Sequence, residues 1–225
     1  IDTICDFRAK DVSLGGQGAP LVPVGDRDLF KEYDCCLNIG GIVNVTKKKP
    51  SLSAYDICIG NLGLNFLARK FNQPFDKAGH IASEGSIDKA LLTKLNDLPY
   101  HSQAFPKSLG FEWVKNRFIP ILEKSICDDK TKLRTVVEHI AMQIGQHING
   151  NTLVTGGGAY NAFLIERIRS NTTFPIVIPD AQMIEFKEAM VFAYLGYLFK
   201  VGKVNILSEI TGSSKDHIGG YIFTP

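Results

Sequence analysis

The chain lacks the phosphate-binding motif GxxxxGK[ST], although glycine is plentiful, with 21 among 225 residues. This absence excludes the nucleotide-binding proteins in which a lysine directly follows a glycine-rich loop. The dinucleotide-binding pattern GxGxxG is missing as well, because neither GGQGAP nor GGGAYN has its spacing. Neither stretch is followed, about 20 residues later, by an acidic residue that ends a strand, so we expect no dinucleotide site.

A strong charge of either sign is also missing. Lysine and arginine number 25 against 23 aspartates and glutamates, which gives a formal net charge of +2. Nucleic-acid-binding domains usually carry a basic face, so we expect no nucleic acid among the partners. No apolar run reaches the roughly 18 residues that cross a bilayer, and no signal peptide is visible at residue 1, so we expect no membrane association.

Cysteine pairs with CxxC spacing are absent, and the number of cysteines is odd. This usage predicts a reducing compartment, hence the cytoplasm, and free thiols that act as small buried apolar side chains. The cysteines are Cys5, Cys35, Cys36, Cys58 and Cys127. The histidines do not cluster either. His139 and His147 lie about two helical turns apart, too far to share a metal, so we expect no protein metal site.

Short β-branched or apolar runs, separated by glycine, proline or lysine-rich turns, predict strands in the first half of the chain. These runs are TICDF, CCLNIGG, IVNVTK and LSAYDICIG, and residues 47–51 are expected to form a hairpin tip. Helices are predicted next. One follows a Ser86 N-cap, a second is broken at Pro120, and a third covers about 132–149 with Gly150 as its C-terminal cap.

The region after Gly150 alternates between strands and helices. NTLVT predicts a strand, GGG a turn, a helix begins near Asn161, and FPIVIP predicts another strand. KEAMVFAYLGYLFKVG predicts a last helix, buried on several sides because it is nearly all apolar, with Glu188 in its first turn. This order of elements predicts an α/β fold, a mixed β-sheet with helices packed on it.

Three glycine clusters each follow a predicted strand, at 15–18, 40–41 and 156–158. Glycine lets the backbone approach a ligand, and successive N–H groups in such turns attract anions, most of all at a helix N-terminus. A single cluster of this kind is usually only a turn. Three of them near the acidic Asp6 indicate a nucleotide site that does not use the lysine motif.

Three charged side chains are candidates for chemistry, and each also has a structural explanation. Asp6 lies at the end of the first predicted strand, where a carboxylate can accept a proton from a hydroxyl or a water during phosphoryl transfer. The alternative for Asp6 is an aspartate that caps a turn or forms a salt bridge. Arg8 can bind a phosphate or pair with Asp11, and Glu188 can complement the dipole of its helix.

Six stretches resemble the anhydro-N-acetylmuramic acid kinases in their order and approximate spacing. They are DFRAKDVSLGGQGAPLVP (6–23), LNIGGIVNVT (37–46), PKSLGFE (106–112), VTGGGAYNAFL (154–164), EFKEAMVFAYLG (185–196) and ITGSSKDHIGGYIF (210–223). The resemblance covers essentially the whole chain, and GGQGAPLVP is its most specific part. It implies an actin-like ATPase (ribonuclease H-like) fold, in which residues 1–225 form a single C-terminal lobe.

The reaction implied by the resemblance opens the 1,6-anhydro ring of anhydro-N-acetylmuramic acid with water and phosphorylates O6 from ATP, with Mg²⁺ as cofactor. Its product, N-acetylmuramic acid 6-phosphate, is an intermediate of peptidoglycan recycling. By resemblance Asp6 is the general base that activates the water. The residues that would shape the sugar pocket or contact the sugar are Arg8, Gly15, Gly16, Gln17, Gly18 and Glu188.

The resemblance also implies a set of ATP-binding residues, in which 40–41 match the second phosphate turn of the family and 156–158 its nucleoside turn. The set is Asn38, Gly40, Gly41, Asp56, Gly60, Asn61, Gly156, Gly157 and Gly158. One segment departs from the family. Where the family usually reads Asp-Thr-Gly-Pro-Gly-Asn, residues 56–61 read Asp-Ile-Cys-Ile-Gly-Asn, so the middle is apolar.

Nothing in the chain matches the family's N-terminal phosphate loop, which is rich in serine, threonine and glycine. We therefore expect ATP, an anhydro amino sugar and an N-terminal lobe of the same protein as partners, and a homodimer is compatible with the resemblance. The alternative is a non-catalytic actin-like module that binds nucleotide or a partner. The missing loop and the altered 57–59 segment favour the module, whereas Asp6, GGQGAP and Glu188 together favour the kinase.

Overall fold

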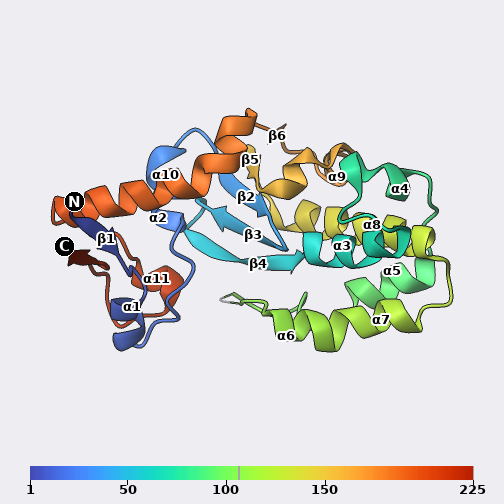
Figure 1. Cartoon of the computed structure of the whole chain (residues 1–225), viewed down its shortest axis with the longest axis horizontal. Helices are drawn as coiled ribbons and strands as arrows, with labels where there is room; N and C mark the ends of the chain where they lie inside the picture. Colours follow the sequence, from blue (N-terminus) through green and yellow to red (C-terminus); the bar gives the residue numbers. More distant parts are fainter. Residues whose placement is uncertain (106, 225) are drawn as a thin grey trace.

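The computed structural model describes residues 1–105 and 107–224, so Pro106, the first residue of PKSLGFE, lies outside the described residues. The molecule is elongated, with a five-stranded sheet in the middle (Figure 1). Helices α3, α5, α7, α8 and α9 gather at one end of this sheet, and the short strands β1 and β7 lie at the other end with α1 and α11. The long helix α10 reaches from the sheet to the chain termini.

The five strands have the order β4-β3-β2-β5-β6. Their bounds are β2 (Cys35–Ile39), β3 (Ile42–Lys47), β4 (Ser53–Ile59), β5 (Thr152–Thr155) and β6 (Ile176–Val177). Strand β3 is antiparallel to both of its neighbours, whereas β5 and β6 continue parallel to β2. A mixed sheet in this order, with only its second strand antiparallel, is the sheet of a ribonuclease H-like lobe. The predicted α/β fold class is confirmed.

The two faces of the sheet are covered by different parts of the chain. One face, which includes Leu37, Val45 and Val154, packs on a large core beneath helices α3 (Asn61–Ala68), α5 (Lys89–Asn96) and α8 (Asp129–His147). The other face presents Cys36 and Leu153 to a second core. Alternating residues of a strand point to opposite faces, so β2, β4 and β5 contribute side chains to both cores.

The helix predicted over 132–149 is confirmed as α8, but both predicted helix caps in this region are wrong. Helix α8 ends at His147, and the next residue is already extended. Gly150 is instead required by packing, because a Cβ there would lie 2.4 Å from a carboxylate oxygen of Asp34. Helix α5 is capped by Asp88, whose carboxylate accepts a hydrogen bond from the N–H of Leu91 at 2.7 Å, and not by Ser86.

The helical segment around Pro120 continues where the sequence predicts a kink or break. It consists of α6 (Phe111–Trp113), a π-helical turn η3 (Val114–Phe118) and α7 (Ile119–Lys124). Proline removes one donor and its ring clashes with the carbonyl four residues earlier. The wider π turn relieves that clash just before the proline. The remaining short elements there are η1 (Arg69–Phe71), η2 (Lys77–Gly79) and α4 (His80–Ser83).

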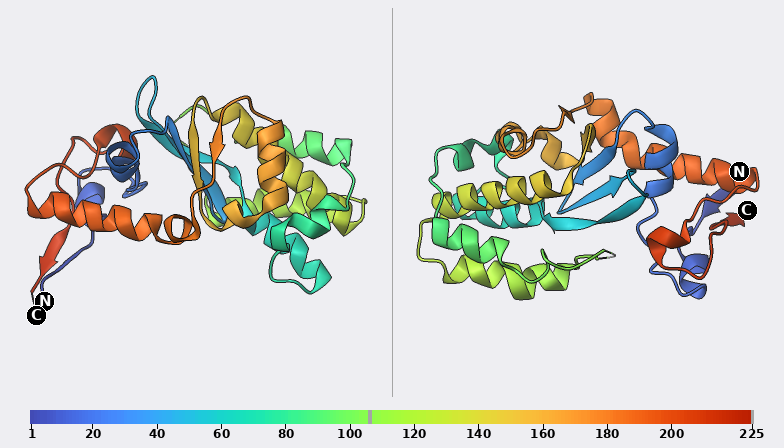
Figure 2. Two further views of the ribbon diagram at one scale, coloured as in Figure 1. Left: turned by 90° about the horizontal axis from the view of Figure 1, so that it is seen from above. Right: turned by 180° about the vertical axis from the view of Figure 1, so that it is seen from behind.

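Strand β1 (Thr3–Cys5) pairs antiparallel with β7 (Tyr221–Phe223), so the two ends of the chain lie side by side (Figure 2). Helices α1 (Ala9–Ser13) and α2 (Pro23–Leu29) follow β1 in the chain, and α11 (Ser208–Thr211) precedes β7. The strand–glycine–helix unit is also confirmed, as β5, the short helix η4 (Gly157–Tyr160) and α9 (Ala162–Ser170) with Asn161 as cap. Among helices of the described ranges, none has the length and apolar character needed to cross a membrane.

Helix α10 (Ala181–Lys200) differs from its prediction in two ways. It begins at Ala181 behind the cap Asp180, so Glu188 lies in its interior and cannot complement the dipole of the first turn. It also buries one face rather than several, because Phe186 and Tyr197 remain 58% and 57% exposed. The prediction that the cysteines are buried holds for Cys35, Cys36 and Cys58, whereas Cys5 is exposed.

Candidate functional site

A row of polar side chains crosses the sheet on the face of the second core. Strand register places Thr155 beside Asn38, Asn38 beside Asn44, and Asn44 beside Asp56. These residues lie on β5, β2, β3 and β4. The next row on the same face is mostly apolar, with Leu153, Cys36, Thr46 and Ala54. The polar row is therefore unusual on an otherwise apolar sheet face. Polar side chains at such a position need hydrogen-bond partners or a bound ligand to offset the cost of their burial.

The polar row forms part of the wall of a cavity of about 470 Å³. Other parts of the wall come from distant segments, with Arg8 and Gln17 near the start of the chain and Glu188 on α10. Six predicted site residues thus meet in one cavity, namely Arg8, Gln17, Asn38, Asp56, Gly156 and Glu188. Lining residues that sequence reasoning missed include Asn44, Lys107, Ser108, Thr155, Glu185 and Lys187.

Two of the predicted glycine clusters, 40–41 and 156–158, lie with Gly60 and Asn61 of the implied ATP-binding set at the end of β2, next to this cavity. The N–H of Gly60 donates to the carbonyl of Gly41 at 2.9 Å, and the N–H of Asn61 donates to Gly40 at the same distance. The Asn61 side chain donates to the carbonyl of Ile39 at 3.3 Å. The turns at 40–41 and 60–61 are therefore one hydrogen-bonded unit at the end of β2.

The third turn, 156–158, is packed against the same end of β2. Gly156 has φ +83°, and a Cβ there would lie 2.4 Å from the Asn38 side-chain oxygen. A Cβ on Gly158 would lie 2.1 Å from a methyl group of Ile39. Gly157 differs, because the nearest atom to its Cβ would be 3.7 Å away, on Asn61. The positive φ is at Gly156, and Gly157 is the position where a side chain fits without moving the fold.

Asp56 is the acidic member of the polar row. Its Oδ2 accepts hydrogen bonds from the N–H of Leu109 at 2.8 Å and the hydroxyl of Ser108 at 3.1 Å, and neither bond uses Oδ1. Burial raises the pKa of Asp56 above its ordinary value. A cation beside the carboxylate would relieve this cost. The apolar Ile57 and Cys58 that follow it are buried in the first core, so the departure from the family pattern does not face the cavity.

Asp6 directly follows β1, as predicted, but it does not line the main cavity. It faces an adjoining hollow that shares Arg8, Leu21 and Phe192 with that cavity. Asp6 is exposed and has a φ of +50°. Its Oδ1 accepts a hydrogen bond from the N–H of Ala9 at 3.0 Å. One oxygen thus caps the turn that leads into α1, and Oδ2 takes no part in that bond.

A sequence model of the anhydro-N-acetylmuramic acid kinase family matches residues 1–225. The chain belongs to this family. It is 35% identical to the anhydro-N-acetylmuramic acid kinase of Vibrio cholerae serotype O1, over 100% of this chain and 65% of that protein. The enzyme of the same description from Sulfurimonas denitrificans is 33% identical, over 99% of this chain and 66% of that protein. The chain thus spans about 65% of the length of these relatives.

Solved structures resemble the chain more weakly. The activator of the 2-hydroxyisocaproyl-CoA dehydratase from Clostridium difficile, with bound ADPNP, has a TM-score of 0.49 at 14% identity and covers 77% of this chain and 64% of its own. Component A of the (R)-2-hydroxyglutaryl-CoA dehydratase of Acidaminococcus fermentans has a TM-score of 0.49 at 15% identity, with 76% and 64% covered.

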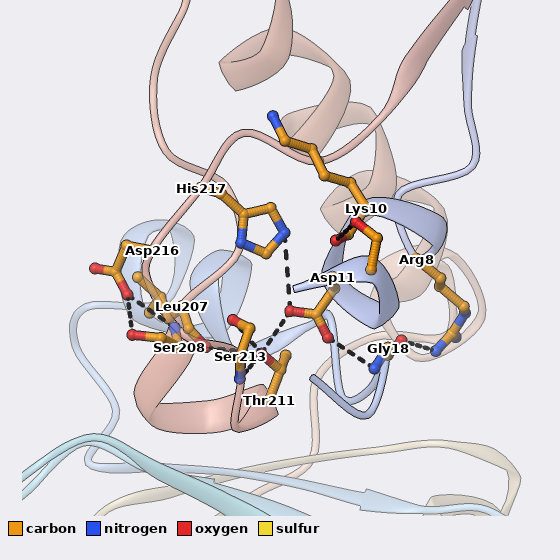
Figure 3. A network of polar contacts seen from close by, with 12 residues as sticks. Arg8, Lys10, Asp11, Gly18, Leu207, Ser208, Thr211, Ser213, Asp216 and His217 are labelled. Atoms are coloured by element: carbon orange, nitrogen blue, oxygen red, sulfur yellow. Dashed lines mark hydrogen bonds and ion pairs between the residues drawn. The ribbon is translucent and has the colours of Figure 1, made fainter. Parts of the chain in front are cut away.

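The GGQG loop is built around the buried carboxylate of Asp11, which the sequence analysis considered only as a partner of Arg8 (Figure 3). Its Oδ2 accepts the N–H of Gly18 and its Oδ1 the hydroxyl of Thr211, both at 2.7 Å. The N–H of Gln17 donates to the carbonyl of Thr211 at 2.8 Å. Asp11 therefore ties the first family motif to the last one, and the pairing of Arg8 with Asp11 is not formed. Arg8 donates to the carbonyl of Gly18 instead.

The glycines of this loop have structural reasons for being glycine. A Cβ on Gly16 would lie 2.2 Å from Oδ2 of Asp11, and Gly15 and Gly18 have φ values of +84° and +69°. None of these three glycines lines the cavity, whereas Gln17 does. The loop is thus folded tightly so that a single polar side chain, Gln17, reaches the cavity.

A buried ion pair fixes α10 at the cavity wall. Nζ of Lys187 lies 2.7 Å from Oδ1 of Asp26 on α2, and the hydroxyl of Thr46 donates to Oδ2 of Asp26 at 2.7 Å. Glu188 follows Lys187 directly, so this ion pair holds the helix turn that carries Glu188. In the sequence, this ion pair is indicated only by the presence of a lysine within an otherwise apolar helix.

The described residues contain no group of three or more histidine, cysteine, aspartate or glutamate side chains that could hold a metal ion. Mg²⁺ does not need such a group, because it is usually held by one or two carboxylates, water and substrate phosphates. Asp56, with the amide oxygens of Asn38 and Asn44 in the same row, is a donor set of the hard oxygen type that Mg²⁺ prefers.

Proposed function

We propose that this chain carries the sugar-binding and nucleotide-binding surface of an ATP-dependent kinase that acts on anhydro-N-acetylmuramic acid in the cytoplasm. The observation that carries the proposal is the shared cavity, in which Arg8 and Gln17, the polar row and Glu188 meet from separate family motifs. The family match over residues 1–225 supports it. The glycine turns at the end of β2 would bind the nucleotide, and the Asp6 side of the cavity would bind the sugar.

The proposed reaction consumes one water, one ATP and one anhydro sugar. The water oxygen bonds to the anomeric carbon while the Asp6 carboxylate accepts one of its protons, and the bond from that carbon to O6 breaks. O6 then takes the terminal phosphoryl group of ATP, and ADP leaves. Oδ2 of Asp6, which is outside the bond to Ala9, is the oxygen available for the proton.

The cavity residues would hold their substrates mainly by charge and hydrogen bonds. Asp56 with Asn38 and Asn44 would hold Mg²⁺, which supplies positive charge to the phosphates during transfer. Glu188 and Gln17 would accept and donate hydrogen bonds to sugar hydroxyl and amide groups. Preorganised groups of this kind provide most of the rate enhancement in phosphoryl transfer.

Turnover is expected to need the part of the relatives that this chain does not span. The 225 residues alone should release no measurable sugar phosphate from ATP and anhydro-N-acetylmuramic acid, and activity should appear when the N-terminal third of the Vibrio cholerae relative is added as a second polypeptide. Coupled ADP assay and mass spectrometry of the sugar measure this. Failure of every such mixture, with both parts folded and nucleotide bound, would favour the non-catalytic module.

The nucleoside turn is tested by Gly157→Val. Because a Cβ on Gly157 would meet no atom nearer than 3.7 Å, we expect a nearly unchanged melting temperature and at least about tenfold weaker ATP binding, since the branched group blocks approach to the turn. Calorimetry with ATP and Mg²⁺ gives the affinity. The control is Gly196→Val on α10, where the Cβ would lie 3.9 Å from Ile4 of β1. Equal ATP affinity in wild type and Gly157→Val would remove this turn from the site.

A further inference from the structure

Three cationic side chains line the cavity, and their charges are used differently. Lys187 is neutralised by Asp26 at 2.7 Å, and Arg8 donates to the carbonyl of Gly18. Lys107 is the third. Within residues 1–105 and 107–224, no carboxylate forms an ion pair with Lys107. Lys107 belongs to PKSLGFE, the family motif to which the proposed function assigns no role.

The Lys107 ammonium is held by aromatic rings rather than by a counter-ion. Its Nζ lies 4.8 Å from the ring centroid of Tyr100 and 5.8 Å from that of Tyr55. Two carbonyls, of Tyr100 and His101, lie at 3.4 and 3.5 Å, which is long for hydrogen bonds. Burial lowers the pKa of Lys107 below its ordinary value. The charge is thus positioned at a cost, and an anion in the cavity would offset that cost.

The segment that carries Lys107 is fastened to the polar row. The N–H of Asp56 donates to the Lys107 carbonyl at 3.4 Å, and Oδ2 of Asp56 accepts from Ser108 and Leu109. Lys107 therefore extends the row beyond β4. Neighbouring strands lie about 4.8 Å apart, so the row from Thr155 to Asp56 is roughly 14 Å long, with the Gly156 turn at one end and the backbone of Lys107 at the other.

We propose that Lys107 is the cation that binds a phosphate group of the nucleotide at the Asp56 end of the polar row. This rests on the proposed nucleotide site and adds to it a lysine that comes from outside the glycine turns, since no lysine follows a glycine loop. Lysine binds phosphate as a compact point charge. The Asp56 carboxylate would repel a bare phosphate, so the expected ligand is a nucleoside triphosphate together with Mg²⁺.

The test compares two ligands that differ only in phosphate. Calorimetry measures the binding of ATP with Mg²⁺ and of adenosine to the 225-residue chain and to Lys107→Met. We expect Lys107→Met to weaken ATP binding by roughly tenfold to hundredfold and to leave adenosine binding unchanged. Lys107→Arg keeps the charge and should lose less. Lys70→Met is the matched control, because Lys70 also lies over one aromatic ring, Phe66 at 5.9 Å, but does not line the cavity.

Each outcome separates the proposals. Unchanged ATP affinity in Lys107→Met would overturn the role of Lys107 and leave the nucleotide site standing. Equal losses for ATP and adenosine, with Lys107→Arg as weak as Lys107→Met, would make the residue a structural part of the 107–109 segment and would overturn the proposal too. A wild-type chain that binds neither ligand, while its melting curve shows it folded, would overturn the proposed nucleotide site itself.

Discussion

Replacement of Asp6 by asparagine should lower kcat by roughly 10² to 10⁴ in the reconstituted enzyme and leave ATP affinity and the melting temperature unchanged. Asparagine keeps the oxygen that accepts the Ala9 N–H and removes only the basicity of the group. It also suits the backbone, because asparagine and aspartate are the side chains most often found at the positive φ that Asp6 adopts, +50°. The variant is therefore a clean probe of proton transfer.

The measurement combines kcat, ATP affinity and thermal midpoint on the same preparations, with Asp2→Asn as an exposed control on the same stretch of chain. Full activity in Asp6→Asn would contradict the base assignment. A loss of activity matched by a loss of stability would return Asp6 to the role of a turn cap. Asp6→Ala helps here, because it removes the cap as well, so a purely structural aspartate would show its full effect only in that variant.

The parts of the fold that follow from local pattern could be predicted. In α8 and in the strand–glycine–helix unit at 152–170, apolar residues follow the period of a helix or a strand. Residues close together in the sequence are therefore enough to predict these elements. The caps at Ser86 and Gly150 were wrong because a cap depends on which side chain the tertiary structure brings near. At Gly150 the decisive neighbour is Asp34, on another part of the chain.

The site was predictable to a similar degree. Asn38 and Asp56 are among the ATP-binding residues that the resemblance implies, whereas Asn44 and Thr155 are not, and they join the row only through strand register, which one sequence does not reveal. The bond between Asp11 and Thr211 joins residues 200 positions apart. Long-range polar pairs of this kind leave no periodic trace in the sequence.

Loss of the charge on Asp26 should produce the largest fall in stability. Asp26 is 2% exposed, and the Lys187 side chain, 2.7 Å away, is 9% exposed. Asp26→Asn keeps an oxygen for the Thr46 hydroxyl but leaves the ammonium buried without a counter-charge, which typically costs about 3–5 kcal/mol. For a chain of this size each kcal/mol shifts Tm by about 2–4 °C, so we expect a drop of roughly 6–20 °C.

The thiol of Cys36, close to this ion pair, cannot replace the missing charge. The nearby Cys36 could do so only as a thiolate, and burial raises the pKa of Cys36 to about 12. The control is Asp28→Asn on the same helix, because Asp28 pairs with Arg27 at a position where the two side chains are 24% and 43% exposed. Pairs that reach solvent usually contribute about 1 kcal/mol or less, so Tm should change little in that variant.

The double variant Asp26→Leu with Lys187→Met decides why the single variant is unstable. Removing both charges leaves apolar side chains of similar volume between α2 and α10, and such replacements are often neutral or stabilising. Tm should therefore recover most of the loss seen in Asp26→Asn. If the double variant is as unstable as the single one, the loss comes from packing and not from the unpaired ammonium. If Asp26→Asn melts within about 2 °C of wild type, the ion pair does not hold α10 on the sheet, and the link from Lys187 to the placement of Glu188 is lost with it.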